Sequence, residues 1–292
     1  MKEERIFKIV EKSKLWFIIS AVILVVCLGS IAFRGLNYGI DFVGGTVVNI
    51  NMEKGFDVTK VRTIVEKYDK SAQVQEVQGN NVSIRSNNLS NEEVATLFKE
   101  IKKDFSLKKN EPVSSERIEP TIGKEITQKA IISSLVAILG ILIYISLRFE
   151  WKFGLAAIAS LIHDLIVTIG IFSIFQIPVN SSFIAAILTI LGYSINDTVV
   201  VFDRIRENSK KKIYNTNVLL GDASLTQTMA RSINTVLTVL IAITSLYIFG
   251  VSAIKEFALP LIIGIAFGGY SSIFIAVPVW VKLVDSCKKK DK

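Results

Sequence analysis

The chain has 292 residues, of which 50% are hydrophobic and 21% are charged, and its formal net charge is +8. Its mean hydropathy is +0.47, so apolar and charged residues must occupy separate blocks. The positive charge lies mainly in short loops between the apolar blocks and needs no nucleic-acid partner to explain it. The two cysteines, Cys27 and Cys287, have no spacing typical of a metal or redox site.

Six apolar windows each approach the roughly 20 residues that cross a bilayer as a helix. They are residues 15–33, 130–147, 154–175, 183–201, 233–250 and 257–281. Buried helices of a soluble protein are the alternative, but such helices are usually shorter and seldom recur six times. The first window is longer than a usual signal-peptide core, and no clear cleavage site follows Gly29 and Ser30. The sequence predicts a multi-pass α-helical membrane protein with six transmembrane helices, the first an uncleaved anchor.

Lysine and arginine residues gather in alternate short loops. They are Lys2, Arg5, Lys8, Lys12 and Lys14 before the first window, Arg148 and Lys152, then Arg204, Arg206, Lys210, Lys211 and Lys212, and finally Lys282, Lys288, Lys289, Lys290 and Lys292. In the opposite loops, residues 176–182 contain none and residues 251–256 contain only Lys255. Because positive loops remain cytoplasmic, both termini are expected in the cytoplasm.

A polar segment, residues 35–129, separates the first two windows and is about the smallest size that forms an independent domain. Its pattern predicts the order β-α-β-β-α-β, which is that of a ferredoxin-like α+β domain, here extracytoplasmic. The expected elements are strand 46–51, helix 58–68, strand 73–77, turn 79–81, strand 82–85, helix 91–105 and strand 112–118. Ser90 and Glu93 fit a capping box for the second helix. The segment has no histidine or cysteine, so binding is expected there rather than catalysis.

Ionisable residues occur within three of the apolar segments. Asp197 lies in the fourth window, where a charge costs roughly 3 kcal/mol and normally faces a polar pathway or a partner. His163 and Asp164 lie in the third window, and Arg231 opens the fifth helix. A carboxyl group in a low dielectric disfavours its charged form, whereas a nearby guanidinium favours it. A guanidinium that moved relative to such a carboxyl group would therefore change its proton affinity.

Two helices carry further patterns. A polar stripe on the fifth helix is expected to face protein or water; it consists of Thr228, Arg231, Thr235 and Thr238. Small residues on the sixth form a ridge that permits close helix packing; they are Gly264, Gly268 and Ser272.

Each functional interpretation has a structural alternative. In the structural alternative, Asp197 is an interhelical hydrogen-bonding residue and Arg231 is an interfacial anchor. Because His163 and Asp164 are adjacent, they are not expected to face the same direction, and a structural role is as well supported as proton transfer. A solvated helix end is the simplest interpretation of Asp203, Arg204, Arg206 and Glu207. Gly44 and Gly45 favour a backbone turn over a ligand site.

Four stretches together resemble the SecF family of protein translocase subunits. They are Gly-Tyr-Ser-Ile-Asn-Asp-Thr-Val-Val-Val-Phe-Asp-Arg-Ile-Arg-Glu-Asn at 192–208, Gly-Ile-Asp-Phe-Val-Gly-Gly-Thr at 39–46, His-Asp at 163–164, and Leu-Thr-Gln-Thr-Met-Ala-Arg-Ser at 225–232. The resemblance runs through the whole chain in the same order, with the same six spans and single outer domain.

The resemblance implies a non-enzymatic accessory subunit, related in architecture to resistance-nodulation-division transporters, in the bacterial cytoplasmic (inner) membrane. Its implied partners are SecD, the SecYEG translocon, the translocating unfolded polypeptide and membrane lipid, with YajC as a further candidate. The family uses the proton gradient, or sodium in some members, to support late export, and no cofactor is implied. Ion coupling carries over to Asp197 and Arg231. The candidate supporting polar residues are His163, Asp164, Asn196, Thr198 and Thr235.

The expected domains are a cytoplasmic N-terminus with the first span (1–34), the ferredoxin-like domain (35–129), a five-helix membrane domain (130–284) and a basic cytoplasmic tail (285–292). Two other functions remain open. A half-size exporter of lipid or small molecules would be expected to carry larger outer domains. A non-conducting structural subunit of the translocon is the other alternative, and Asp197 and Arg231 argue against it.

Overall fold

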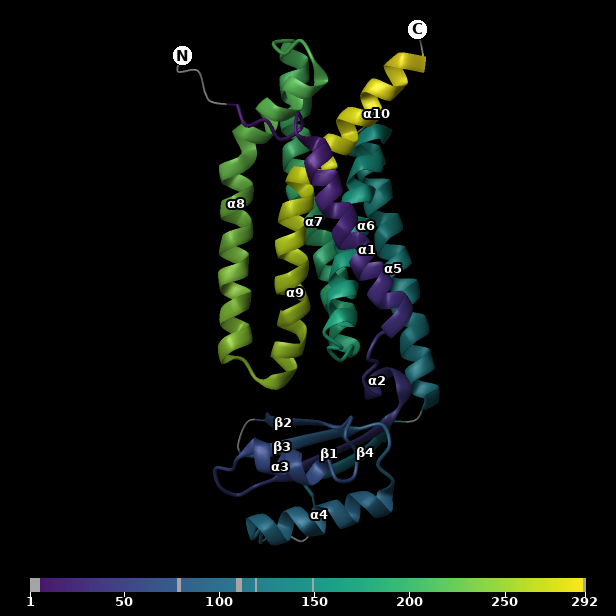
Figure 1. Cartoon of the computed structure of the whole chain (residues 1–292), viewed down its shortest axis with the longest axis vertical. Coiled ribbons are helices and arrows are strands. Elements are labelled where there is room, and N and C mark those ends of the chain that lie inside the picture. The colour runs from purple at the N-terminus through teal and green to yellow at the C-terminus, as the bar shows by residue number, and fades with distance from the viewer. Residues whose placement is uncertain (1–5, 78–79, 109–111, 119, 149, 291–292) are drawn as a thin grey trace.

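The computed structural model describes residues 6–77, 80–108, 112–118, 120–148 and 150–290. A bundle of long helices carries a small α/β domain at one end, and both ends of the chain lie at the other (Figure 1). Gly79 of the expected turn and three of the basic residues, Lys2, Arg5 and Lys292, lie outside the described residues.

Five described helical stretches are long and apolar enough to cross a membrane. The first four are α1 (Ser13–Arg34), α6 (Trp151–Ile174), α7 (Ser181–Lys211) and α8 (Asn217–Phe249). The fifth stretch, Ile254–Cys287, runs through α9 (Ser252–Ser271), a π-helical turn η1 (Ser272–Ala276) and α10 (Val277–Lys290). A further helix, α5 (Pro120–Arg148), begins before the expected window at 130, and its described apolar part, Thr127–Ile141, is shorter than a span.

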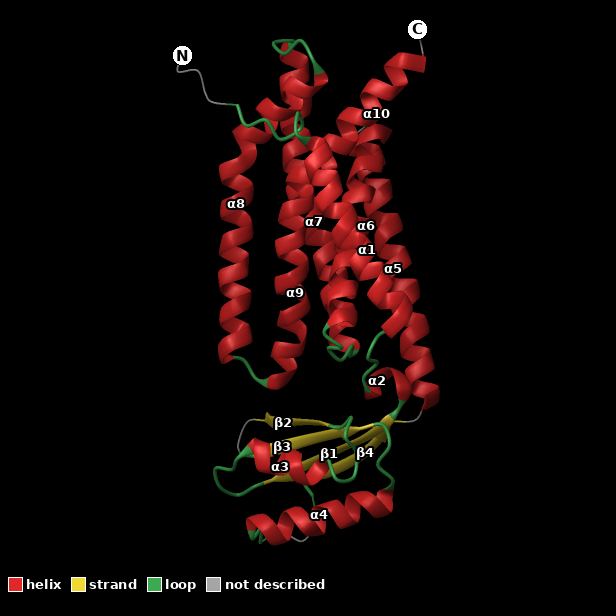
Figure 2. Cartoon of the chain, in the orientation of Figure 1, coloured by secondary structure: helices red, strands yellow, loops and turns green. Residues whose placement is uncertain are grey.

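The α/β domain contains one antiparallel sheet with two helices (Figure 2). Its elements are β1 (Gly45–Asn51), α3 (Val58–Val65), β2 (Gln73–Val77), β3 (Asn81–Ser86), α4 (Asn91–Phe105) and β4 (Ser114–Ile118), and the strand order is β2-β3-β1-β4. The predicted order of elements is confirmed. The bounds of β2 and α4 agree with the prediction, and the Ser90–Glu93 capping box is present.

Burial alternates along β1 and places one set of its side chains in the core of this domain. Val48 and Ile50 of β1 belong to the same buried cluster as Val61 of α3 and Leu97 of α4. Burial alone would raise the pKa of Asp69, but hydrogen bonds from Ser71 and Ser86 outweigh it and hold the pKa below its ordinary value. Asp69 therefore ties the segment before β2 to β3 as a carboxylate.

The predicted glycine turn precedes β1. A short helix, α2 (Ile40–Val43), which the sequence pattern did not indicate, ends at Gly44. Gly44 and Gly45 have φ angles of 83° and 153°, and a Cβ atom on Gly45 would lie 2.5 Å from the Ser86 carbonyl oxygen. These positions require glycine for backbone reasons, which confirms the turn.

The predicted small-residue ridge, which runs from α9 into η1, allows close helix packing, and its partner is α7. A Cβ atom on Gly264 would lie 2.3 Å from Ile190, and one on Gly268 would lie 3.2 Å from Ser194. Ser272, at the start of η1, contacts Thr198 of α7. The close approach of these helices brings the polar groups of η1 next to those of α7.

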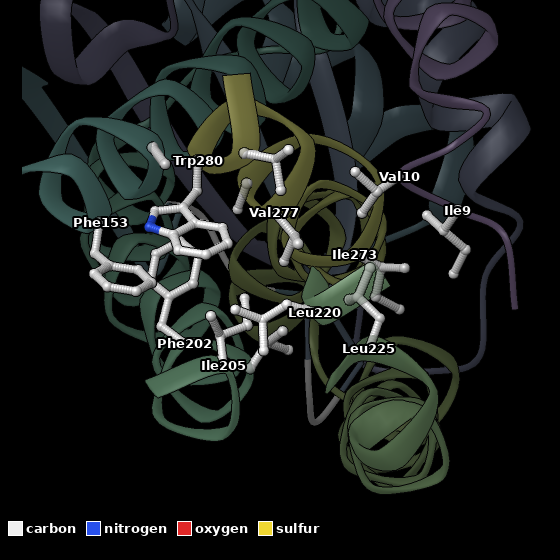
Figure 3. Close-up of a cluster of buried hydrophobic side chains, with 14 of the residues drawn as sticks. Ile9, Val10, Phe153, Phe202, Ile205, Leu220, Leu225, Ile273, Val277 and Trp280 are labelled. Atoms are coloured by element: carbon white, nitrogen blue, oxygen red, sulfur yellow. The ribbon is translucent and has the colours of Figure 1, made fainter. Parts of the chain in front are cut away.

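A cluster of apolar side chains closes the end of the bundle away from the α/β domain (Figure 3). Phe153 of α6 stacks on Trp280 of α10, with ring centroids 4.9 Å apart. Ile9 and Val10 join the cluster from the N-terminal segment because the Asp222 carboxylate of α8 accepts hydrogen bonds from both of their backbone NH groups. This segment is therefore fixed to the bundle.

Glu256 of α9 joins the membrane helices to the α/β domain. Its carboxylate accepts hydrogen bonds from Gln75 of β2 at 2.9 Å, from Arg85 of β3 at 3.2 Å and from Asn180, which precedes α7, at 2.9 Å. A cavity of about 660 Å³ lies beside this joint, between β2 and the adjacent helix ends. The joint connects the sheet to α9 and to the residue that precedes α7.

Candidate ion-coupling site in the helix bundle

Asp197 lies on the buried face of α7. Ser194, Asp197, Thr198 and Val201 are all buried and recur at helical spacing, so this face packs inside the bundle. Asp197 is only 6% exposed, and its Oδ2 atom has no hydrogen-bond partner among the described residues. A buried carboxyl oxygen without a partner is costly, which is unusual for a group whose role is structural.

Arg231 and Ser232 of α8 both act on Asp197. The positive charge of Arg231 acts on the carboxyl group, and Ser232 lies beside it. Arg231 is exposed, and the described residues include no ion pair within 4 Å that joins it to Asp197. Ser232 is 1% exposed, and its hydroxyl has no hydrogen-bond partner in the described structure. The two helices thus bring Arg231 near enough to act on Asp197 without forming an ion pair within 4 Å in the described structure.

A small cavity adjoins Asp197 between α7, α8 and α9. Its volume is about 10 Å³, close to that of one water-sized probe. Polar lining is contributed by Tyr193, Ser194, Asn196, Asp197 and Thr235. Two of the predicted supporting residues, Asn196 and Thr235, are therefore at the site. This space suits a single water molecule or a small ion beside the carboxyl group.

A second buried carboxyl group, Asp164 of α6, lies within the same bundle. It is 1% exposed. Its Oδ2 atom accepts hydrogen bonds from Ser194 of α7 at 2.6 Å and from Ser271 of α9 at 2.7 Å. Its Oδ1 atom lies 3.1 Å from His163 Nδ1. Asp164 thus connects three helices at one point.

The expectation that His163 and Asp164 face different directions is wrong. His163 is 3% exposed, so its side chain is buried like that of Asp164, and the two side chains contact each other. Adjacent helix positions direct their Cα–Cβ bonds differently, but the rotamers of the two side chains turn them towards each other. The Nε2 atom of His163 has no hydrogen-bond partner among the described residues, and its ring lies 6.0 Å from that of Tyr270.

Hydroxyl groups link α7 to the π-helical turn. Thr198 Oγ1 lies 2.8 Å from Ser272 Oγ, and both hydroxyls approach the Ser194 carbonyl oxygen. Thr198, a predicted supporting residue, therefore braces the helix rather than lining the cavity. A π-helical turn frequently marks a functional position in a membrane helix because it shifts the side chains that follow it.

The polar stripe of α8 is mostly uncovered. Thr228 is buried, Thr235 is half-buried, and Arg231 and Thr238 are exposed. The hydroxyls of Thr235 and Thr238 donate to carbonyl oxygens of their own helix. The stripe therefore begins inside this chain and continues on a face that the described residues leave open.

Sequence reasoning missed several polar members of the site. Ser194 stands one helical turn before Asp197, and this spacing on a buried face was the available signal. Ser232 follows Arg231 directly. Ser271 gave no separate signal because a serine in an apolar helix is usually a packing residue.

The other predicted polar groups behave as a solvated helix end. Glu207 accepts from Arg204 at 2.7 Å and from Lys211 at 2.8 Å, and all three side chains are at least a third exposed. These pairs are local to α7 and do not reach the buried site.

Comparison with known proteins assigns the family. The model described as "Protein export membrane protein SecD/SecF, C-terminal" matches residues 94–286, and that described as "SecD/SecF GG Motif" matches residues 29–55. The chain is 39% identical to the protein translocase subunit SecF of Haemophilus influenzae, covering 91% of this chain and 82% of that protein. It is 38% identical to SecF of Sebaldella termitidis, covering 98% and 94%.

Longer proteins contain a similar unit. Protein translocase subunit SecDF of Bacillus subtilis is 37% identical over 96% of this chain and 38% of its own length. The crystal structure of SecDF from Thermus thermophilus, described as a translocon-associated membrane protein, superposes with a TM-score of 0.80 at 32% identity, and this chain spans 98% of its own length and 40% of that chain. With these matches over nearly its whole length, the chain belongs to the SecF family of protein translocase subunits.

Proposed function

We propose that this chain is an accessory subunit of the Sec translocase that couples the proton motive force to late-stage export of unfolded polypeptides. It acts with SecD beside the SecYEG channel, with YajC as a further partner, and it performs no enzymatic reaction and uses no cofactor. The coupling ion is a proton, and sodium is the alternative that a flux assay separates.

The observation that carries this proposal is the Asp197 carboxyl group. It belongs to a helix long enough to cross a membrane and is buried within the helix bundle, where its Oδ2 atom lacks a hydrogen-bond partner among the described residues. It lies next to a water-sized cavity, and the charge of Arg231 acts on it. Such a group is suited to bind and release a small ion as its surroundings change. One proton crossing the membrane supplies about 2.3 kcal/mol per 100 mV, which biases a conformational equilibrium about 50-fold.

The partner is argued from the open stripe of α8. Arg231 and Thr238 are exposed on a helix that is apolar enough to lie in a membrane, where a polar face needs protein or water. The Bacillus subtilis relative is named SecDF, so a single protein there combines the names SecD and SecF, and this chain matches 38% of its length. A separate SecD subunit packed against α8 would cover the stripe and complete the site.

The finer architecture belongs to the same proposal. We assign six transmembrane helices by counting α5, whose helix runs from Pro120 to Arg148. We assign the α/β domain to the ferredoxin-like fold because its strand order is β2-β3-β1-β4. The domain limits remain those expected from the sequence, residues 1–34, 35–129, 130–284 and 285–292.

Orientation is tested by cysteine labelling. We place the chain in the bacterial cytoplasmic membrane with both termini inside, because the basic loops lie at the end of the bundle opposite the α/β domain. In a background without the native cysteines, a cysteine at exposed Lys99 of α4 should react with an impermeant maleimide in spheroplasts. A cysteine at exposed Lys210 should react only after permeabilisation. The reverse pattern would invert the orientation and the direction of ion flow.

Depletion of the chain tests the function itself. Cells depleted of it should lose the part of export that responds to the membrane potential, and a plasmid copy should restore that part. Export would be followed in inverted membrane vesicles with and without an imposed gradient, using a pulse-labelled secretory protein. Equal stimulation by the gradient in depleted and complemented vesicles would contradict the proposal, whereas stimulation by a sodium gradient alone would assign sodium.

A further inference from the structure

We propose that Asp164 is a second proton-binding site, connected to Asp197 through the Ser194 hydroxyl and the water-sized cavity. This inference rests on the proposed ion-coupling function and extends it from one carboxyl group to two. The two carboxyl groups belong to different helices, α6 and α7, and Ser194 is placed between them.

Ser194 is the only described side chain that both lines the cavity and bonds to Asp164. Its hydroxyl donates to Asp164 Oδ2 at 2.6 Å, and Ser194 also lines the cavity with Asp197. Because Ser194 and Asp197 are three residues apart on α7, they lie on the same side of that helix. The close packing of Gly268 against Ser194 holds the hydroxyl at this position.

One unpartnered atom lies on Asp197, at one end of the connection, and another on His163, which contacts Asp164 at the other end. Asp197 Oδ2 and His163 Nε2 are buried and have no hydrogen-bond partner in the described part of the chain. The groups that face Asp164 are Ser194 from α7, Ser271 from α9 and His163 from its own helix, with Tyr270 of α9 beside the histidine ring. No lysine or arginine bonds to Asp164 among the described residues. A proton arriving at Asp164 therefore meets no fixed positive charge that would repel it.

The transfer balances without any other reactant. A protonated Asp197 gives its proton to a water molecule in the cavity, and that water gives one of its protons to Ser194 Oγ. Ser194 gives its own proton to Asp164 Oδ2 at the same time, so the serine ends with one proton as it began. One proton moves from Asp197 to Asp164, and no covalent bond other than O–H bonds changes.

The chain offers a matched pair of variants. Ser194 and Ser271 both donate to the same Asp164 oxygen, at 2.6 and 2.7 Å, and both are buried. Only Ser194 lines the cavity beside Asp197. Loss of either hydroxyl removes one hydrogen bond from Asp164, but only Ser194→Ala interrupts the connection.

The test uses the chain co-purified with SecD and reconstituted in liposomes that contain a pH-sensitive dye. Ser194→Ala should lower proton flux by about tenfold, equivalent to about 1.4 kcal/mol on the barrier, and clearly more than Ser271→Ala, which removes a hydrogen bond from the same Asp164 oxygen but leaves the connection in place. Both variants should lose similar thermal stability. In infrared difference spectra between acidic and alkaline pH, Asp164→Asn should remove one component of the carboxyl absorption and Asp197→Asn a different one.

Equal flux in the two serine variants, or an infrared difference spectrum unchanged by Asp164→Asn, would overturn the second site. Those results leave the proposed function intact if Asp197→Asn still abolishes flux. Normal flux in Asp197→Asn would instead contradict the proposed function. The serine pair keeps the test decisive even if Asp164→Asn fails to assemble with SecD.

Discussion

Asp197→Asn is expected to abolish ion-driven export while leaving the chain folded and bound to SecD. Asparagine has nearly the same shape as aspartate but does not release a proton, so the side chain remains neutral throughout the cycle. Because Asp197 Oδ2 has no hydrogen bond of normal geometry among the described residues, the substitution disturbs at most a loose contact with the Ser232 hydroxyl beside it. The loss should therefore appear in coupling and not in stability.

The size of the effect follows from the energy of the ion. A proton crossing at about 100 mV supplies about 2.3 kcal/mol. When Asp197 no longer binds the proton, none of this energy reaches export, so the gradient-dependent part of export should vanish within error. Proton flux and export would be measured on the same vesicles, at expression matched to the unaltered chain. Co-purification with SecD would establish that assembly is intact.

The matched control is Asp203→Asn, which makes the same chemical change on the same helix. Asp203 lies in the solvated segment after the span and is partly exposed. It should retain flux and gradient-dependent export. Equal losses in the two variants would attribute the defect of Asp197→Asn to the net charge of α7, and normal export in Asp197→Asn would remove it from the coupling role.

The elements of the α/β domain followed from local rules. Strand β2 was expected from the local sequence pattern, and α4 from a capping box whose Ser90 and Glu93 lie three residues apart. Both depend on neighbours in sequence, so the sequence contains the information. Helix α2 was missed because four residues give no measurable periodicity.

The buried site was predictable only in part. Asp197 was identifiable because an acidic residue in an apolar span is rare and costly. The connection from Ser194 to Asp164 joins residues on different helices, and its existence depends on how closely α6, α7 and α9 pack. The expectation for His163 failed for the same reason, since helix periodicity fixes the direction of a Cα–Cβ bond but not the final rotamer.

Arg231→Met is expected to reduce ion flux strongly and to be non-additive with Asp197→Asn. The positive charge of Arg231 acts on Asp197 across the α7–α8 interface. Methionine retains much of the length and apolar stem of arginine but removes the charge. The carboxylate then loses its positive neighbour, so the step in which the ion leaves the site becomes less favourable.

The double variant decides whether the two residues act as one device. If they do, its loss should equal that of Asp197→Asn alone, because the second change disables a site that no longer works. Because Asp197→Asn is expected to leave no flux to reduce, independence is tested in Asp197→Glu, which keeps a proton-binding carboxyl group: residues that act independently would there multiply their separate reductions in flux. Flux should be measured for both single variants and the double variant in complexes with SecD.

Arg231→Lys is the conservative control, because it keeps the positive charge and loses the planar guanidinium. We expect it to retain part of the flux that Arg231→Met loses, since charge and not bidentate bonding links Arg231 to Asp197 here. The exposure of Arg231 leaves room for a lysine side chain to reach the same depth. Normal flux in Arg231→Met, or independent losses in its combination with Asp197→Glu, would return Arg231 to the role of an interfacial anchor and leave Asp197 to work with a charge from SecD.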